Sequence, residues 1–124
     1  MPEKFYSVAE ANALIPSLRS LLPRIRETQQ ALAQDKTLAR VREKAAHNGG
    51  GQPGRHLSEM TRTLEQDLHQ LEEWGIVLRD PHIGLIDFFH RREGQTVFLC
   101  WKLDESAVEW WHPVDTGVAG RQRL

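Results

Sequence analysis

The sequence predicts an α+β fold, in which a long antiparallel helical hairpin packs on a small antiparallel β-sheet with a short C-terminal helix. Three features of the 124 residues support this: apolar residues at helical spacing in the first half, a glycine-rich break at 47–54, and strand-like segments after Gly75. A chain of this length fits a single domain, 1–124, with the hairpin in 1–75 and the sheet in 76–124.

The first helix is expected to begin after Ser7, because Ser7 and Glu10 have the spacing of a capping box. The apolar residues that follow at helical spacing are Ala11, Leu14, Ile15, Leu18, Leu22 and Ile25. Pro16 removes one intrahelical donor, so we expect either a kink or a short first helix with Pro16 opening a second. Pro23 adds a second irregularity.

Residues 47–54 contain four glycines and a proline, which oppose both helix and strand. We interpret them as a flexible loop rather than a phosphate-binding loop, because the Lys-Ser/Thr pair of the Walker pattern is missing. A second helix is predicted from Arg55 to Trp74, with Gly75 as its C-cap. Its apolar stripe is Leu57, Met60, Leu64, Leu68, Leu71 and Trp74. Two long helices joined by a short loop should pair as an antiparallel hairpin.

The segments Leu85–His90 and Thr96–Leu103 are rich in strand formers and flank the glycine-containing turn 91–95, which predicts a β-hairpin. A hairpin of two strands is only marginally stable, so Ile76–Leu78 is predicted to add a third strand.

The last part of the chain is predicted to form a short helix and an irregular tail. Asp104 has the side chain to cap a helix over Glu105–Trp111, and His112-Pro113 would end that helix. Val114–Leu124 is expected to be irregular.

Five segments carry a resemblance to a known family. They are Phe5 with Glu10 to Pro16, Gly84 to Phe88 (GLIDF), Phe98 to Leu103 (FLCWKL), Trp111-His112, and Gly117 with Gly120 to Gln122 (GRQ). This pattern resembles a prokaryotic domain-of-unknown-function family of short single-domain proteins with a helical first half. The resemblance covers nearly the full chain and implies the same one-domain fold. It brings no activity, substrate or cofactor with it.

Composition and charge argue against several classes of partner. A net charge of −1 provides no basic field for nucleic acid. Apolar runs are only a handful of residues long, so no membrane span is expected. A single cysteine excludes an internal disulfide and suits the reducing cytosol, so a cytoplasmic protein is expected.

The sharpest chemical pattern is Glu109-x-x-His112. On a helix, residues three apart share a face, so a carboxylate and an imidazole there can converge on one cation. Asp115 follows after the chain turns at Pro113, and Asp87 lies on a predicted strand. The candidate metal ligands are therefore Asp87, Glu109, His112 and Asp115. This mixed oxygen and nitrogen set would suit Zn, Mn or Fe.

A structural interpretation of the same residues stays open. His112 would then hydrogen-bond a backbone carbonyl, and Asp87 would pair with Arg121 or Arg91. Cys100 lies between apolar residues of a strand, which favours a buried structural thiol over a nucleophile.

Arg121, Trp101 and Trp111 are candidates for contacting an anion or another ligand. Arg121 follows two glycines in the tail, where a guanidinium can anchor an anion. The tryptophans offer stacking surfaces, although packing in the core is the favoured explanation for them.

Two functional classes remain open, so the sequence does not decide whether the protein is an enzyme. The first is a non-enzymatic interaction or regulatory module, expected to form a homo-oligomer (a dimer) or to bind a protein partner. The second is a small metal-binding protein or metal-dependent enzyme that uses the carboxylate and histidine site.

Overall fold

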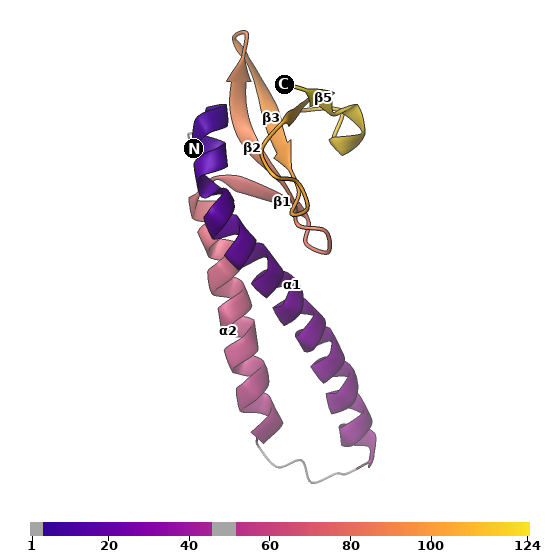
Figure 1. The fold of residues 1–124 in the computed structure, drawn as a ribbon. Helices are drawn as coiled ribbons and strands as arrows, with labels where there is room; N and C mark the ends of the chain where they lie inside the picture. The colour runs from indigo at the N-terminus through magenta and orange to yellow at the C-terminus, as the bar shows by residue number, and fades with distance from the viewer. Residues whose placement is uncertain (1–3, 46–51) are drawn as a thin grey trace.

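The computed structural model describes residues 4–45 and 52–124, with side chains for 4–34 and 57–124. Two antiparallel helices form a long hairpin, and a small sheet lies against one end of it (Figure 1). The helices are α1 (Val8–Ala45) and α2 (Gln52–Glu73). The predicted α+β class and helical hairpin are confirmed.

The capping box predicted at the start of α1 is present. The Glu10 backbone N–H donates to Ser7 Oγ at 3.0 Å, and the Ser7 N–H donates to Glu10 Oε1 at 2.8 Å. These bonds from the backbone and side chain of Ser7 lower the pKa of the Glu10 carboxyl. The helix start is therefore fixed by local chemistry.

Of the two alternatives expected at Pro16, a second helix opening there was wrong, because α1 runs unbroken through Pro16 and Pro23. A proline inside a helix costs about 3 kcal/mol. Leu18, Leu22 and Ile25 lie on both sides of Pro23 and are almost fully buried in the core. Their packing holds the helix together across the two missing donors.

The glycine-rich loop expected at 47–54 ends earlier in the sequence than predicted. Residues 46–51 lie outside the described residues, but α2 begins at Gln52, so 52–54 are helical. Proline is tolerated in the first turn of a helix, where its missing N–H would have no intrahelical partner.

The sheet has five antiparallel strands in the order β1-β2-β3-β4-β5. The strands are β1 (Ile76–Asp80), β2 (Leu85–Arg92), β3 (Gln95–Trp101), β4 (Trp110–Pro113) and β5 (Gln122–Arg123). The predicted β-hairpin is β2–β3, turning at Glu93 (φ 51°) and Gly94 (φ 79°). Positive φ at both positions is the signature of a type I′ turn. The predicted third strand is β1.

The helix predicted over Glu105–Trp111 is absent: 104–109 form a loop and Trp110 begins β4. Trp111 pairs with Leu99 of β3, and the Val108 N–H donates to Asn12 Oδ1 at 2.8 Å. Pairing with β3 and α1 outweighs the local capping signal. The C-terminal helix of the fold is instead η1 (Val118–Gly120), a single 3₁₀ turn.

The two faces of the sheet differ in chemistry. The face toward the hairpin supplies Ile86, Phe88, Leu99 and Trp101 to the core, all fully buried. Side chains alternate along a strand, so Asp87, Phe98 and Cys100 lie on the opposite face. Residues of the C-terminal segment lie against that face and line a cavity of about 370 Å³ beside Asp87. In the part of the chain described, no helix combines the length and apolar character needed to cross a membrane.

Candidate functional site

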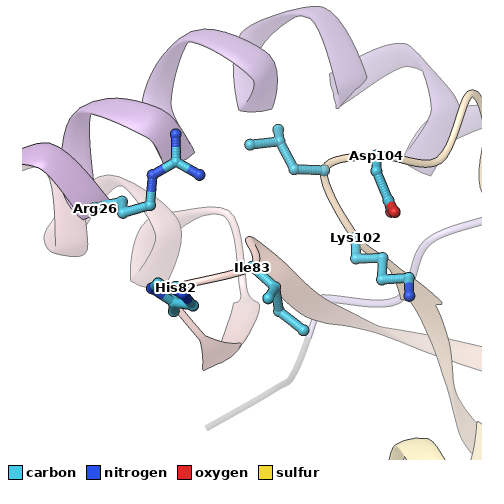
Figure 2. Close-up of a pocket in the computed structure, with 6 residues that line it drawn as sticks. Arg26, His82, Ile83, Lys102 and Asp104 are labelled. Carbon is cyan, nitrogen blue, oxygen red and sulfur yellow. The ribbon is translucent and has the colours of Figure 1, made fainter.

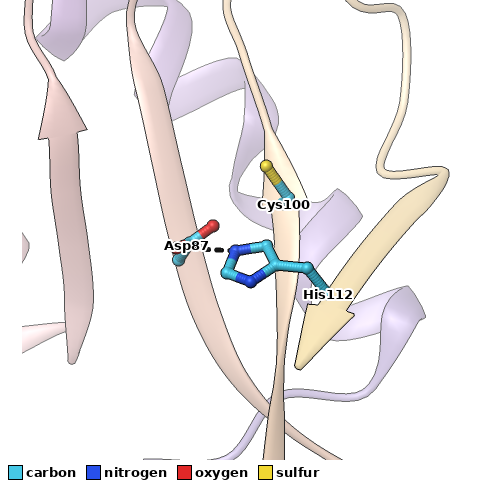
Figure 3. Close-up of side chains that lie close together, drawn as sticks. All are labelled: Asp87, Cys100 and His112. Carbon is cyan, nitrogen blue, oxygen red and sulfur yellow. Dashed lines mark hydrogen bonds and ion pairs between the residues drawn. The ribbon is translucent and has the colours of Figure 1, made fainter. Parts of the chain in front are cut away.

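Asp87, Cys100 and His112 form a buried polar cluster on the face of the sheet away from the helices (Figure 3). They come from three neighbouring strands, β2, β3 and β4, and Asp87 is directly opposite Cys100 in the register. Each is at most 1% exposed. One potential ligand atom from each lies within 4.8 Å of the other two. Among the described residues, this is the group that could hold a metal ion.

One oxygen of Asp87 carries the ionic contacts of the cluster. Asp87 Oδ2 accepts a hydrogen bond from Arg79 Nε at 2.8 Å and lies 3.0 Å from His112 Nε2. The Arg79 guanidinium also stacks 4.9 Å from the centre of the Phe98 ring, and its side chain is 42% exposed. Asp87 Oδ1 is buried and has no hydrogen-bond partner in the structure. One arginine therefore connects the buried carboxylate to the surface.

The hydrogen bonds of His112 determine which of its ring nitrogens carries a proton. Nδ1 lies 2.8 Å from the carbonyl oxygen of Pro113. A carbonyl oxygen only accepts, so Nδ1 must carry the proton. Nε2 then faces Asp87 Oδ2, which already accepts from Arg79. Two lone pairs do not attract each other, so a proton or another cation must lie between Nε2 and the carboxylate.

Cys100 is not a nucleophile in this setting. Burial, reinforced by the negative charge of Asp87, raises the pKa of the Cys100 thiol to about 12, although Arg121 opposes the shift. The reactive species is the thiolate, which is hardly populated at neutral pH at such a value. This agrees with the sequence interpretation of a buried structural thiol.

Arg121 pairs with Glu105 rather than with Asp87. Its Nη2 lies 2.6 Å from Glu105 Oε2, and both side chains are 15% exposed. The guanidinium stacks 4.8 Å from the centre of the Trp110 ring. An arginine held by a carboxylate and a ring fastens the tail to the sheet. Its predicted role in contacting an anion or ligand stays a prediction.

The structure brings together two of the four predicted metal ligands. Asp87 and His112 meet across the sheet, whereas Glu109 pairs with Arg123 at 3.3 Å on the surface and Asp115 is exposed. The premise for adding Glu109 was a shared helical face. In β4 the chain is extended, so this premise does not hold.

The two tryptophans predicted to contact a ligand lie in different settings. Trp101 is fully buried, and its Nε1–H donates to the carbonyl oxygen of Glu105 at 3.1 Å. Trp111 is partly buried beneath the guanidinium of Arg92, which stacks 4.6 Å from the ring centre. Packing accounts for Trp101, while Trp111 keeps some exposed surface.

Sequence reasoning missed the roles of Arg79 and Cys100. Both lie on strands, and strand alternation places Cys100 on the face opposite to Leu99 and Trp101. The signal that could have found them is the register of the β2–β3 hairpin, counted outward from its turn. That count places Cys100 directly across from Asp87.

Comparison with known proteins defines the family but not the activity. No curated protein and no solved structure matches the chain. The sequence model of the family described as "Uncharacterized conserved protein (DUF2203)" matches residues 4–124. The chain therefore belongs to this family.

Proposed function

We propose that the protein is a non-enzymatic interaction module that works as a homodimer, with the helical hairpin as the dimer interface. The observation that carries this is the hairpin itself, whose outer part extends beyond the sheet (Figure 1). The lone buried thiol supports a cytoplasmic location for such a module.

The polar cluster behind the sheet supports a structural rather than a catalytic role. Asp87, Cys100 and His112 are each at most 1% exposed, and the polar atoms of His112 are used internally. A general base must reach a proton on a substrate, and a nucleophile must be ionised and accessible. Neither condition is met by this cluster as it stands.

The apolar stripe of α2 is only partly covered among the described side chains. At about 1.5 Å per residue, the 38 residues of α1 span about 57 Å. In α2, Leu64 and Leu68 reach the core, and Leu57 and Met60, further out, are only partly buried. A second hairpin would complete a four-helix bundle.

Charge favours a second copy of this chain as the occupant. Between Val8 and Ala45, α1 carries seven Lys and Arg against four Asp and Glu, a net charge of +3. Between Gln52 and Glu73, α2 carries two against five, a net charge of −3. If a two-fold axis places α1 of one copy beside α2 of the other, a positively charged helix faces a negatively charged helix at each of the two contacts.

The test is a charged substitution in the apolar stripe with a matched control on the same helix. Met60→Glu should convert the dimer to a monomer in size-exclusion chromatography with light scattering, because it buries an unpaired carboxylate in the interface. The control is Thr61→Glu, which adds the same charge at an exposed position. The proposal fails if both variants elute with the mass of the wild type.

A second candidate function is metal binding by Asp87, Cys100 and His112, supported by the unpartnered Asp87 Oδ1 and by the position beside His112 Nε2 that either a proton or another cation must fill. Thiolate, imidazole and carboxylate together favour Zn²⁺ over Mn or Fe. The Nδ1–H bond to Pro113 is the support usually given to a histidine that ligates through Nε2.

Metal analysis of protein purified without a nickel column tests this candidate. One equivalent of zinc in the wild type, lost in Cys100→Ala and kept in the surface control Glu109→Gln, is the expected result. The site is ruled out if none of the three proteins contains stoichiometric zinc and if added Zn²⁺ does not raise the melting temperature.

A further inference from the structure

We infer that the protein has an anion-binding site between α1 and two loops of the sheet, suited to a small phosphate monoester with an apolar body. A cavity of about 370 Å³ lies there (Figure 2). Its lining residues are Arg26, His82, Ile83, Lys102, Leu103 and Asp104. Small-molecule sites in proteins have volumes of this order.

Three basic residues from separate elements line this cavity, and the Lys102 side chain runs away from Arg26 and His82 (Figure 2). Arg26 comes from α1, His82 from the β1–β2 turn, and Lys102 from the segment after β3. Asp104 is the single acidic residue among the lining residues. The local balance is therefore cationic in a chain whose net charge is −1.

Two of these cations are not used by the fold. Within the described part of the chain, the side chains of Arg26 and Lys102 make no hydrogen bond or ion pair. Two residues earlier on α1, Arg24 binds Asp67 through two hydrogen bonds of 2.7 Å, and this raises the pKa of Arg24. Arg24 thus has a dedicated carboxylate, whereas Arg26 is left for another anion.

The β1–β2 turn that carries His82 is held in place. The His82 backbone N–H donates to Asp80 Oδ1 at 2.9 Å. Gly84 has φ +67°, and a Cβ there would lie 2.8 Å from Leu103 Cβ. The turn therefore packs closely against the opposite wall of the cavity, which requires glycine at this position.

The loop that carries Lys102 is fixed on the other side. The Lys102 N–H donates to Glu105 Oε1 at 3.0 Å, and the Glu105 N–H returns a bond to the Lys102 carbonyl at 2.9 Å. Arg19 of α1 donates to the Glu105 carbonyl at 3.1 Å. A cavity whose walls are fixed in advance loses less entropy on binding.

The lining chemistry selects the ligand class. The guanidinium of Arg26 and the imidazole of His82 can donate to oxygens of one phosphate, and the ammonium of Lys102 adds positive charge further along the lining. Ile83, which is 44% exposed, and Leu103 add an apolar surface beside them. A second hollow of about 280 Å³ shares Arg26 and His82, so a ligand held there has room along α1. A monoester presents both the doubly charged head and the carbon body.

Isothermal titration with three probes tests the inference: phenyl phosphate, inorganic phosphate and benzoate. Phenyl phosphate should bind most tightly, because it alone offers both the dianion and the ring. Equal binding of inorganic phosphate would overturn the role of the apolar wall. Equal binding of benzoate would overturn the assignment to phosphate.

Variants identify the place of binding. Arg26→Gln should weaken phenyl phosphate binding by about ten-fold or more, the effect of one charged hydrogen bond, and Lys102→Gln should weaken it by less. Arg62→Gln, on the exposed side of α2, should leave binding unchanged. Melting temperatures are measured first, and all three variants should match the wild type. Equal affinity in all variants, or no binding up to about 10 mM phenyl phosphate, would overturn the site.

Discussion

Replacing Asp87 by alanine should destabilise the protein strongly, because the loss leaves a buried partner without an acceptor. The Arg79 side chain is 42% exposed and can turn to water. The His112 side chain is 1% exposed and cannot, so its Nε2 is left unsatisfied. Breaking a buried pair in this way costs about 3–5 kcal/mol. At about 4 °C per kcal/mol, the melting temperature should fall by roughly 12–20 °C.

Urea unfolding followed by tryptophan fluorescence measures this loss. The control is Glu109→Ala, whose exposed partner Arg123 lies at 3.3 Å, and it should cost less than about 1 kcal/mol. The double variant Asp87→Leu with His112→Leu should be less destabilised than the sum of the single changes, because both buried polar groups are then removed. A loss below about 1 kcal/mol for Asp87→Ala would refute the claim that the cluster is satisfied through this carboxylate.

Three further changes test local features. The folded pKa of Cys100, about 12, lies above its ordinary 9.0, so only the unfolded thiol ionises between these values. The contribution of Cys100 to the free energy of unfolding is therefore fully present below pH 9 and falls by about 1.4 kcal/mol per pH unit above it. Cys100→Ala should remove this part of the pH dependence in urea titrations. The part that remains comes from Tyr6, whose pKa is also raised. Gly84→Ala should lower the free energy of unfolding by about 1–3 kcal/mol and more than Gly94→Ala, since both have positive φ but only Gly84 is crowded. Ser7→Ala should cost about 1 kcal/mol in the same assay through loss of the helix cap.

The features predicted correctly are those whose signal is local in the sequence. The Ser7–Glu10 spacing identified the start of α1, and the turn around Gly94 identified the β2–β3 hairpin. The periodic apolar residues identified both helices and their antiparallel pairing. In each case the residues that decide the structure are neighbours in the chain.

The features predicted wrongly depend on contacts between distant residues. Over 105–111, the backbone hydrogen-bonds to β3 and to Asn12 rather than forming helical bonds within the segment. Val108 and its partner Asn12 are 96 residues apart in the chain. The partner of Asp87 is Arg79, which lies on the neighbouring strand, rather than Arg91 or Arg121. Strand register and sheet order determine such pairs. A shift of the register by one residue would move each side chain to the other face of the sheet.

Asp87 and His112 were named as ligands for different reasons: His112 came from the Glu109-x-x-His112 spacing on an expected helix, which the structure replaces by β4. A buried carboxylate requires a partner, and this requirement pointed to Asp87. Cys100 was set aside, since a thiol between Leu99 and Trp101 packs like any apolar residue. Its membership in the cluster follows only from three strands lying side by side.

Sedimentation velocity over a wide concentration range measures dimerisation through the hairpin. We expect a species of twice the 14.3 kDa chain mass that dissociates on dilution and more readily at high salt, because opposite charges on α1 and α2 meet across the interface. A single species of 14.3 kDa up to about 0.5 mM, unaffected by salt, would contradict it.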